Sequence, residues 1–324
     1  MARADLLINM VKAGSQGDRL RFKKIVEALA AEERAKNHHV LADRLEEGLR
    51  VNGSPLPQQR GFDDKLSQLI YELTPQRRLQ DLILPETVEV ACSELIEEQH
   101  RRDLLRSYNL EPRHRVLLAG PPGNGKTSLA EVLAESLMMP LLQIRYEGIV
   151  GSFLGETAQR LKQVFDYVRS RHCILFFDEF DAIGKERGDV HETGEIKRVV
   201  SSLLMQMDEL PSHVVIVVAS NHPELLDRAV WRRFQLRLNL PLPTQKMIEE
   251  WFRRFSTRFD TPLGYAPGTL AEKLRGLSFA EIEDFGQDIQ RRYVLSLPGG
   301  NIKQIIAERL KQWQARFSVS SNNY

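Results

Sequence analysis

The chain has 324 residues, enough for two or three compact units with a sizeable core. Its formal net charge is +1 and its pI is about 7.8, so no overall field draws it toward nucleic acid or a membrane surface. Cys92 and Cys173 lack metal-ligand spacing, and apolar stretches such as 214–219 are far too short to span a bilayer. The start of the chain also lacks the apolar segment of a signal peptide, so we expect a cytoplasmic protein.

Residues 1–50 predict a small helical unit. Apolar residues recur at helical spacing in three stretches, which are Leu6, Leu7, Met10 and Val11; Phe22, Ile25, Val26 and Leu29; and Leu41, Leu45 and Leu49. The charges between them are mixed, as expected for a solvated face. The adjacent His38 and His39 have no cysteine or second histidine pair nearby, so we interpret them as polar surface residues and not as a metal site. Residues 51–64 contain a Pro- and Gly-rich stretch without apolar periodicity and predict a linker.

From residue 65 the pattern changes to apolar runs of strand length alternating with helical stretches. The runs are 115–119, 141–144, 173–177 and 214–219. Strands separated by helices predict a parallel sheet covered on both faces, so the fold class is α/β over residues 65–241. Residues 242–324 predict an all-α part, with helices over 245–259, 269–275, 279–296 and 302–317. Ser278 and Glu281 form a predicted capping box at the start of the third of these helices.

Residues Gly120–Thr127 read GPPGNGKT, a full match to the phosphate-binding loop G-x-x-x-x-G-K-[ST]. The loop lies between a predicted strand and a predicted helix, so backbone N–H groups and a helix N-terminus would face a polyphosphate. The predicted nucleotide-binding residues are Pro122, Gly123, Asn124, Gly125, Lys126, Thr127 and Ser128. Lys126 would reach the β- and γ-phosphates, and the Thr127 hydroxyl would ligate Mg²⁺. A turn that is glycine-rich for other reasons is the alternative.

A second motif follows the apolar run 173–177. Asp178 and Glu179 would lie at the carboxyl end of that strand, where ligands bind in open α/β sheets. We expect Asp178 to hold Mg²⁺ and Glu179 to polarise the attacking water. Without the phosphate-binding loop, the same two acids would be an ordinary solvated strand end.

A third segment, Val214–Phe234, completes an ordered set of motifs that resembles the AAA ATPases over roughly residues 78–316. The resemblance implies a P-loop NTPase fold in which the C-terminal helices form a lid. It also implies that Asn221 senses the γ-phosphate and orients water. Arg232 and Arg233 match the arginines that one subunit supplies to its neighbour's ATP site, although Trp231 stands where one branch has a further arginine. Which arginine is the finger stays open, and pairing with local carboxylates is the alternative role.

Two further positions follow from the resemblance. Residues 147–156 resemble the first pore loop of members that thread substrates, with Phe153 as the central aromatic between Ser152 and Leu154; a packing role for Phe153 is the alternative. Residues 185–195 are placed like the second pore loop. Upstream, Ile83 and Leu84 would form apolar walls of the adenine pocket.

The resemblance therefore implies an ATP-hydrolysing motor with ATP and Mg²⁺ as cofactors, assembled as a homo-oligomeric and typically hexameric ring that remodels or threads a protein substrate. A nucleic-acid-handling loader is one alternative, although residues 1–50 lack a basic face with interleaved aromatics. An ATP-controlled switch that regulates a partner is the other. Residues 1–60 lie outside the resemblance, where the family places a recognition domain. A fainter likeness to bacterial AAA proteins paired with subtilisin-like proteases implies a protease partner in a defence module.

Overall fold

The computed structural model describes residues 19–36, 38, 42, 64–146, 154–183 and 202–320. Its centre is a six-stranded sheet in the order β1-β3-β4-β5-β2-β6. The strands are β1 (Ile70–Leu73), β2 (Arg115–Ala119), β3 (Leu141–Ile144), β4 (Cys173–Phe177), β5 (Val214–Ser220) and β6 (Leu236–Asn239). Every neighbouring pair is parallel except β1 and β3, which are antiparallel. The predicted α/β class is confirmed, and the sheet is parallel as predicted except at its edge strand β1.

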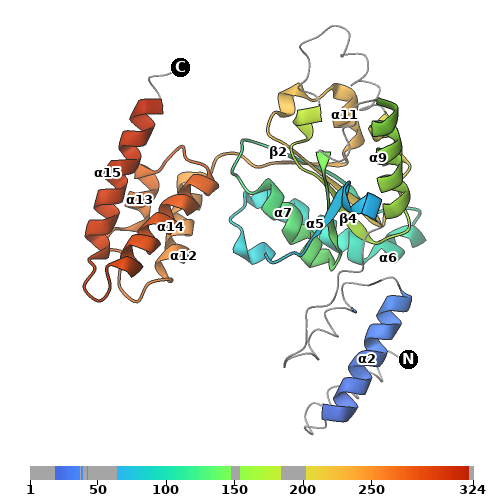
Figure 1. The fold of residues 1–324 in the computed structure, drawn as a ribbon, viewed down its shortest axis with the longest axis horizontal. Coiled ribbons are helices and arrows are strands. Elements are labelled where there is room, and N and C mark those ends of the chain that lie inside the picture. Colours follow the sequence, from blue (N-terminus) through green and yellow to red (C-terminus); the bar gives the residue numbers. More distant parts are fainter. Residues whose placement is uncertain are drawn as a thin grey trace.

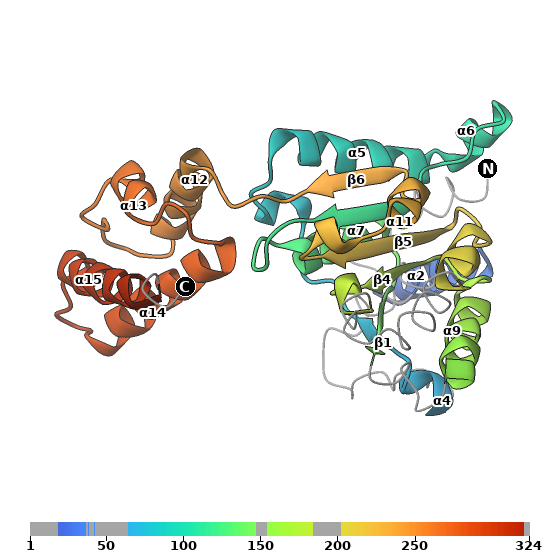
Figure 2. The same cartoon turned by 90° about the horizontal axis from the view of Figure 1, so that it is seen from above.

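Helices cover both faces of this sheet (Figures 1 and 2). They are α5 (Glu86–His100), α6 (Arg102–Ser107), α7 (Lys126–Leu137), α9 (Leu154–Val168) and α11 (Arg228–Arg233), with a further helical stretch at 202–208. Short turns of helix occur at α4 (Asp64–Ser67), η1 (Leu79–Asp81), η2 (Phe180–Ile183) and η3 (Pro223–Leu225). No helix in the described ranges is long and apolar enough to cross a bilayer.

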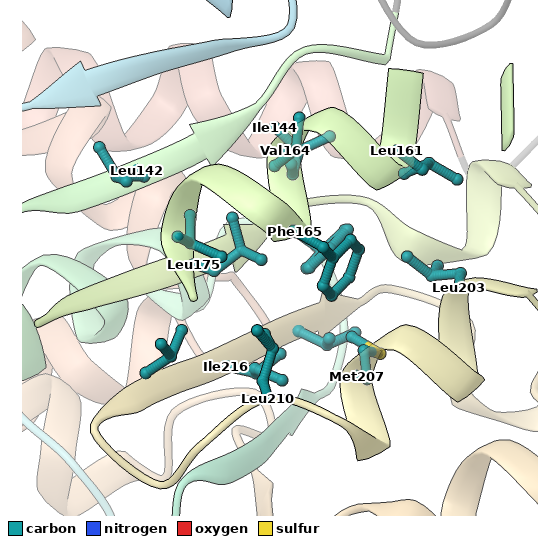
Figure 3. Close-up of a cluster of buried hydrophobic side chains, with 14 of the residues drawn as sticks. Leu142, Ile144, Leu161, Val164, Phe165, Leu175, Leu203, Met207, Leu210 and Ile216 are labelled. Carbon is teal, nitrogen blue, oxygen red and sulfur yellow. The ribbon is translucent and has the colours of Figure 1, made fainter. Parts of the chain in front are cut away.

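Alternating side chains along the central strands divide the core into two layers. In β4, Leu175 and Phe177 pack with α9, the helix at 202–208 and α11, as Figure 3 shows for part of that cluster. Ile174 and Phe176 point to the other face and pack with α5 and α7. All five β4 side chains are buried, which explains why this strand reads as a continuous apolar run.

The C-terminal helices form a separate bundle beside the sheet (Figures 1 and 2). They are α12 (Gln245–Ser256), α13 (Pro267–Lys273), α14 (Phe279–Leu295) and α15 (Ile302–Ser320). An aromatic core holds them together, with Trp251 stacked on Phe255 at 4.8 Å between ring centroids. Gly286 is required there because a Cβ atom would lie 2.4 Å from Trp251 Cη2. The predicted capping box between Ser278 and Glu281 is present at the start of α14.

The N-terminal part is described mainly by α2 (Arg19–Ala35), which corresponds to the second predicted helix. The first predicted stretch and most of the third lie outside the described residues. His38, just after α2, bonds Glu33 through Nδ1 at 2.7 Å, and its ring lies 6.0 Å from that of His172, next to β4. Among the residues that the structure describes, no group of three His, Cys, Asp or Glu side chains is placed to hold a metal ion.

Candidate nucleotide site

The phosphate-binding loop leaves the carboxyl end of β2 and enters α7. Its first glycine, Gly120, has φ of +144°, and a Cβ atom there would lie 2.2 Å from the Leu240 carbonyl oxygen. Gly125 has φ of +84° and directly precedes the first turn of α7. Both positions favour glycine because side chains strain this backbone conformation. The loop therefore has the strand, turn and helix order that the motif predicts.

Lys126 is folded back into its own loop. Its ammonium group donates hydrogen bonds to the carbonyl oxygens of Gly120 at 2.7 Å and Pro121 at 2.9 Å. Burial lowers the pKa of Lys126, and the carboxylates of Asp178, Glu179 and Asp181 oppose that shift. A buried ammonium that bonds only neutral carbonyl oxygens among the described residues is a ready partner for an anionic phosphate.

The two predicted magnesium ligands lie side by side. Thr127 Oγ1 donates to Asp178 Oδ2 at 2.8 Å, which joins the start of α7 to the end of β4. Hydroxyl and carboxylate oxygens are the donors that Mg²⁺ prefers, so this pair fits the ion in type. Glu179 follows with its backbone N–H bonded to Asp178 Oδ1 at 3.0 Å, a φ of +47° and an exposed side chain.

Asp181 is a site residue that the sequence interpretation missed. It is buried, and its Oδ1 accepts hydrogen bonds from Ser220 Oγ at 3.1 Å and from the Asn221 backbone N–H at 3.0 Å. These bonds fix the end of β5 and therefore the position of the predicted sensor Asn221. The third acid of the Asp-Glu-Phe-Asp sequence was the available signal, but its role depends on β5 lying beside β4.

The phosphate-binding loop is also bonded to the lid. The first turn of α14 donates Ala280 N–H to the Gly123 carbonyl at 2.9 Å and Phe279 N–H to Asn124 Oδ1 at 3.3 Å. Gly123 has φ of +76°, and a Cβ atom there would lie 2.9 Å from Ser278 Oγ. The buried Asn124 is therefore a link between the loop and the lid as well as a predicted nucleotide contact.

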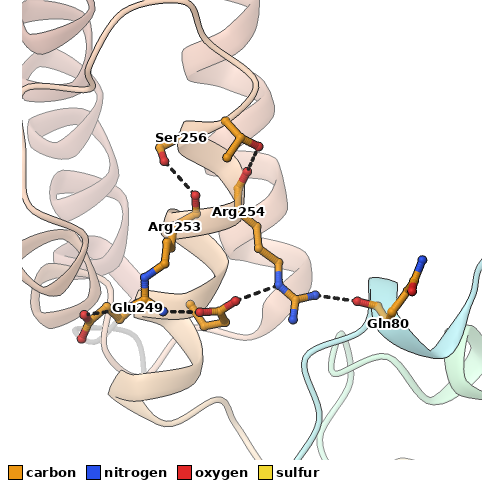
Figure 4. A network of polar contacts seen from close by, with 7 residues as sticks. Gln80, Glu249, Arg253, Arg254 and Ser256 are labelled. Carbon is orange, nitrogen blue, oxygen red and sulfur yellow. Dashed lines mark hydrogen bonds and ion pairs between the residues drawn. The ribbon is translucent and has the colours of Figure 1, made fainter.

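A second contact joins the lid to the predicted adenine pocket. Arg254 on α12 donates to the Gln80 carbonyl oxygen at 2.7 Å, and its Nε bonds Glu250 at 3.0 Å (Figure 4). Ile83, three residues later, packs against the lid core, whereas Leu84 packs against the sheet core. The two predicted pocket residues thus lie where the two parts of the chain meet. Arg77 also reaches the loop region and donates to Ser128 Oγ at 2.6 Å, a contact that the sequence does not reveal.

The two predicted finger arginines differ in their surroundings. Arg233 Nε bonds Asp208 Oδ2 at 2.9 Å, and Asp208 Oδ1 also accepts from Arg115 at 2.5 Å. Arg232 is exposed and makes no hydrogen bond or ion pair within the described part of the chain. Arg233 therefore pairs with a local carboxylate, which was the alternative role in the sequence interpretation. Arg232 is exposed to solvent and remains a candidate finger.

The arginines also lie far from the phosphate-binding loop of the same chain. Gln235, two residues after Arg233, accepts hydrogen bonds at Oε1 from the backbone N–H groups of His114 and Arg115, at 3.0 and 3.1 Å. Arg115 begins β2, whereas the loop follows the end of β2. Five extended residues separate the two places by roughly 13–17 Å. The structure therefore brings Lys126, Thr127, Asp178, Glu179 and Asn221 to one edge of the sheet, and places Arg232 and Arg233 toward the other.

The predicted pore-loop residues Ser152 and Phe153 lie outside the described residues, as does the stretch 185–195. Leu154 is the first residue of α9.

Comparisons with known proteins bear on this arrangement. The model of the AAA family, described as the ATPase family associated with various cellular activities, matches residues 116–242. A protein named uncharacterized AAA family ATPase y4kL, from Sinorhizobium fredii, is 33% identical over 98% of this chain and 93% of its own length. A proteasome-activating nucleotidase from Sulfurisphaera tokodaii is 34% identical over 56% of this chain. An AAA ATPase forming ring-shaped complexes, from Corynebacterium kroppenstedtii, is 33% identical, also over 56%.

The chain spans 48% of the length of the nucleotidase and 37% of that of the ring-forming ATPase. The Sinorhizobium relative, in contrast, is matched almost from end to end. The matched family segment holds the phosphate-binding loop, both acids after β4, and the two arginines. The chain therefore belongs to the AAA family of ATPases, binds nucleotide and hydrolyses ATP.

Proposed function

We propose that this ATPase is a Mg²⁺-dependent motor that assembles as a homo-oligomeric, hexameric ring in the cytoplasm and remodels or threads a protein substrate. One observation carries the proposal: Arg232 projects, without a partner in the described chain, from the side of the sheet opposite the phosphate-binding loop. A guanidinium in that place cannot reach the nucleotide of its own subunit. It is suited to the nucleotide of an adjacent copy, where it would spread the charge of the transferring phosphoryl group.

Within each site the residues would act as follows. Lys126 exchanges its loop carbonyls for the β- and γ-phosphates, and the backbone from Pro122 to Ser128 surrounds them. Thr127 and Asp178 would hold Mg²⁺, which neutralises phosphate charge when it is bound. Glu179 accepts a proton from the attacking water, and Asn221, fixed through Asp181, orients that water. Ile83 contributes an apolar wall for the adenine.

Arg232 is the main finger in this proposal, and Arg233 supports it. The support comes from their different bonding: Arg233 is already paired with Asp208, so its guanidinium is less available to a phosphate. The name of the Corynebacterium relative supports assembly as a ring. We further propose that residues 1–50 form the recognition unit, joined by a linker over 51–64 to an ATPase core over 65–241 and a lid over 242–324.

The substrate proposal rests on the sequence of the loop that contains Phe153 and on a relative named for activating a proteasome. If the partner is a protease, this chain would act on a protease as the name of that relative describes for the proteasome. Two outcomes would favour other functions. Stimulation of hydrolysis by DNA alone would favour a loader, and ATP-dependent binding without steady turnover would favour a switch.

The test compares ATP hydrolysis by the wild-type chain and by Phe153→Ala, alone, with unfolded casein, and with single-stranded DNA. We expect casein to stimulate the wild type and not the variant, because an aromatic side chain that contacts an extended polypeptide is lost. The basal rate and melting temperature of Phe153→Ala should match the wild type. A fall in melting temperature, of the size that losing about 3–5 kcal/mol of packing would produce, would contradict the pore-loop role.

A further inference from the structure

Tyr146 lies beside the acids of the nucleotide site. It comes two residues after the end of β3, and β3 pairs with β4 in parallel, with Gln143 opposite Phe176. Tyr146 therefore lies just beyond the carboxyl end of β3, and Asp178 and Glu179 lie just beyond the carboxyl end of the neighbouring β4. Because the carboxyl ends of parallel strands meet at one edge of the sheet, this tyrosine belongs to the same edge as the phosphate-binding loop.

The hydroxyl group of Tyr146 is buried without a partner among the described residues. The ring packs against the sheet core that contains the apolar side chains of α9. Its Oη atom is shielded from solvent and has no hydrogen-bond partner in the described ranges. Folded proteins rarely leave a buried hydroxyl unpaired, because the group loses its bonds to water and gains none in return. An orphaned hydroxyl beside a ligand site therefore points to a partner that arrives with the ligand.

The electrostatic surroundings identify the kind of partner. Burial raises the pKa of Tyr146, and the carboxylates of Asp178, Asp181 and Glu179 raise it further. The same three carboxylates act on the Lys126 ammonium, so the phenol and the lysine share one acidic environment. A phenol with a raised pKa keeps its proton near neutral pH and can donate it in a hydrogen bond.

We propose that Tyr146 is a positioning residue of the ATPase site: its hydroxyl donates a hydrogen bond to a water molecule held by the acids after β4 when Mg²⁺ and nucleotide are bound. Water can fill a small polar space that offers it two or more partners, and a phenol with carboxylates provides them. The phenol thereby helps to fix the water that Glu179 activates. This inference rests on the proposed roles of Asp178 and Glu179, and Tyr146 itself touches no reacting phosphate.

The chain offers a matched control in Tyr167 on α9. Its ring packs against the same core cluster, and its pKa is also raised by burial. Its charged neighbours are Arg171, whose guanidinium lies 4.1 Å from the ring centroid, and Glu72. None of the three site carboxylates acts on it. A Tyr→Phe change at position 167 therefore removes the same atom from the same core at a distance from the nucleotide.

The experiment compares Tyr146→Phe and Tyr167→Phe with the wild type. For Tyr146→Phe we expect kcat to fall about fivefold to twentyfold, the effect of one lost hydrogen bond, while KM for ATP stays within about twofold. The melting temperature without nucleotide should not fall, because the lost hydroxyl had no partner. The rise in melting temperature on adding Mg²⁺ and a non-hydrolysable ATP analogue should be smaller than in the wild type. Tyr167→Phe should keep the wild-type kcat.

Several results would overturn the inference. Unchanged kcat in Tyr146→Phe would do so, as would a raised KM with unchanged kcat. Either result would show that the hydroxyl does not help to position the attacking water. Loss of folding or a clear drop in melting temperature without nucleotide would show that the hydroxyl has a partner in the empty protein. The proposed function is tested separately by Glu179→Gln. If Glu179→Gln loses hydrolysis and Tyr146→Phe keeps it, only the role of Tyr146 fails.

Discussion

The polar and charged side chains at the two edges of the sheet differ in the partners that they bond. At the amino edge, where β2, β4 and β5 begin, several ion pairs are completed within the chain, although Gln99 Oε1 and Arg115 Nε are buried there without a partner among the described residues. Arg113 bonds Glu98 through Nε at 2.8 Å and Glu94 at 3.0 Å, and Gln99 donates to the carbonyl oxygens of Arg113 and Ser212 at 2.7 and 3.2 Å. At the carboxyl edge, and within the described ranges, Lys126 bonds only neutral carbonyl oxygens and the Tyr146 hydroxyl has no partner.

Ion pairs join distant segments at the amino edge, whereas the buried Lys126 ammonium at the carboxyl edge bonds carbonyl oxygens and no carboxylate among the described residues. Ion pairs and hydrogen bonds completed inside the chain need nothing further, so the amino edge connects α5, α6 and the strands. Groups whose bonds are incomplete are the ones that a nucleotide, an ion or another subunit can satisfy. Arg232 also lies toward the amino edge, but it has no partner in the described chain, so another subunit could pair with it.

The largest expected effect on ATP hydrolysis comes from a substitution of Arg232. Arg232→Ala should lower ATP hydrolysis about 10³-fold or more, because a positioned arginine is lost from a phosphoryl-transfer site. Mixing it with Lys126→Ala subunits should restore part of the activity, since each variant supplies what the other lacks at a shared interface. Steady-state ATPase assays across mixing ratios measure this. If confirmed mixed assemblies show no recovery at any ratio, the arginine does not act on a neighbour.

Glu179→Gln tests the carboxyl edge directly. We expect hydrolysis to fall about 10²- to 10⁴-fold with nucleotide affinity kept, because the water loses its proton acceptor while Lys126 and Thr127 remain. Glu111→Gln is the matched control, since Glu111 bonds Ser212 and Arg106 at the amino edge. Fluorescent-nucleotide binding and phosphate release measure the two quantities. If Glu179→Gln hydrolyses ATP near the wild-type rate, the assignment of Glu179 as the general base is wrong.

The smallest expected effect is a dependence of stability on pH at the amino edge. Burial, with Arg102, His213, His38 and Arg106 nearby, lowers the pKa of His172 from 6.5 to about 4. The folded chain therefore favours neutral His172, whose Nδ1 accepts from Arg102 Nη1 at 3.1 Å. The stability that depends on neutral His172 is fully present above about pH 6.5 and is lost as the pH falls toward about 4.

We expect the melting temperature of the wild type to fall between pH 7 and pH 5 by more than that of His172→Gln. Glutamine can still accept a hydrogen bond from Arg102 but does not titrate. His100→Gln, at the exposed end of α5, is the control and should follow the wild type. Equal slopes for all three proteins would show that His172 is not responsible for the loss.

The sequence predicted the buried strands and much of the nucleotide site, because both depend on local patterns. The runs at 115–119, 141–144 and 173–177 are β2, β3 and β4. The strands β1 and β6 were missed: they lie at the sheet edges, are short, and mix apolar with polar residues. Edge strands carry a weaker signal since one face or end remains solvated.

The residues missed at the site share a different cause. Asp181 bonds the end of β5, Arg77 bonds Ser128 on α7, and the proposed role of Tyr146 depends on the acids after β4, so each depends on segments that are distant in the sequence. The sequence likewise left both arginines as candidate fingers. One difference between their environments is that Asp208, from the helix at 202–208, reaches Arg233 and not Arg232.

The opposite placement of Arg232 and the acid cluster also limits how copies of this chain can meet. In a twofold, isologous dimer each surface patch faces its own copy, so guanidinium would approach guanidinium, or carboxylate would approach carboxylate. A heterologous, head-to-tail contact instead joins the Arg232 side of one copy to the side of the next that carries Asp178 and Glu179. Like charges disfavour the first geometry and unlike charges favour the second. Head-to-tail contacts are those that close into rings when the rotation between copies is a simple fraction of a full turn.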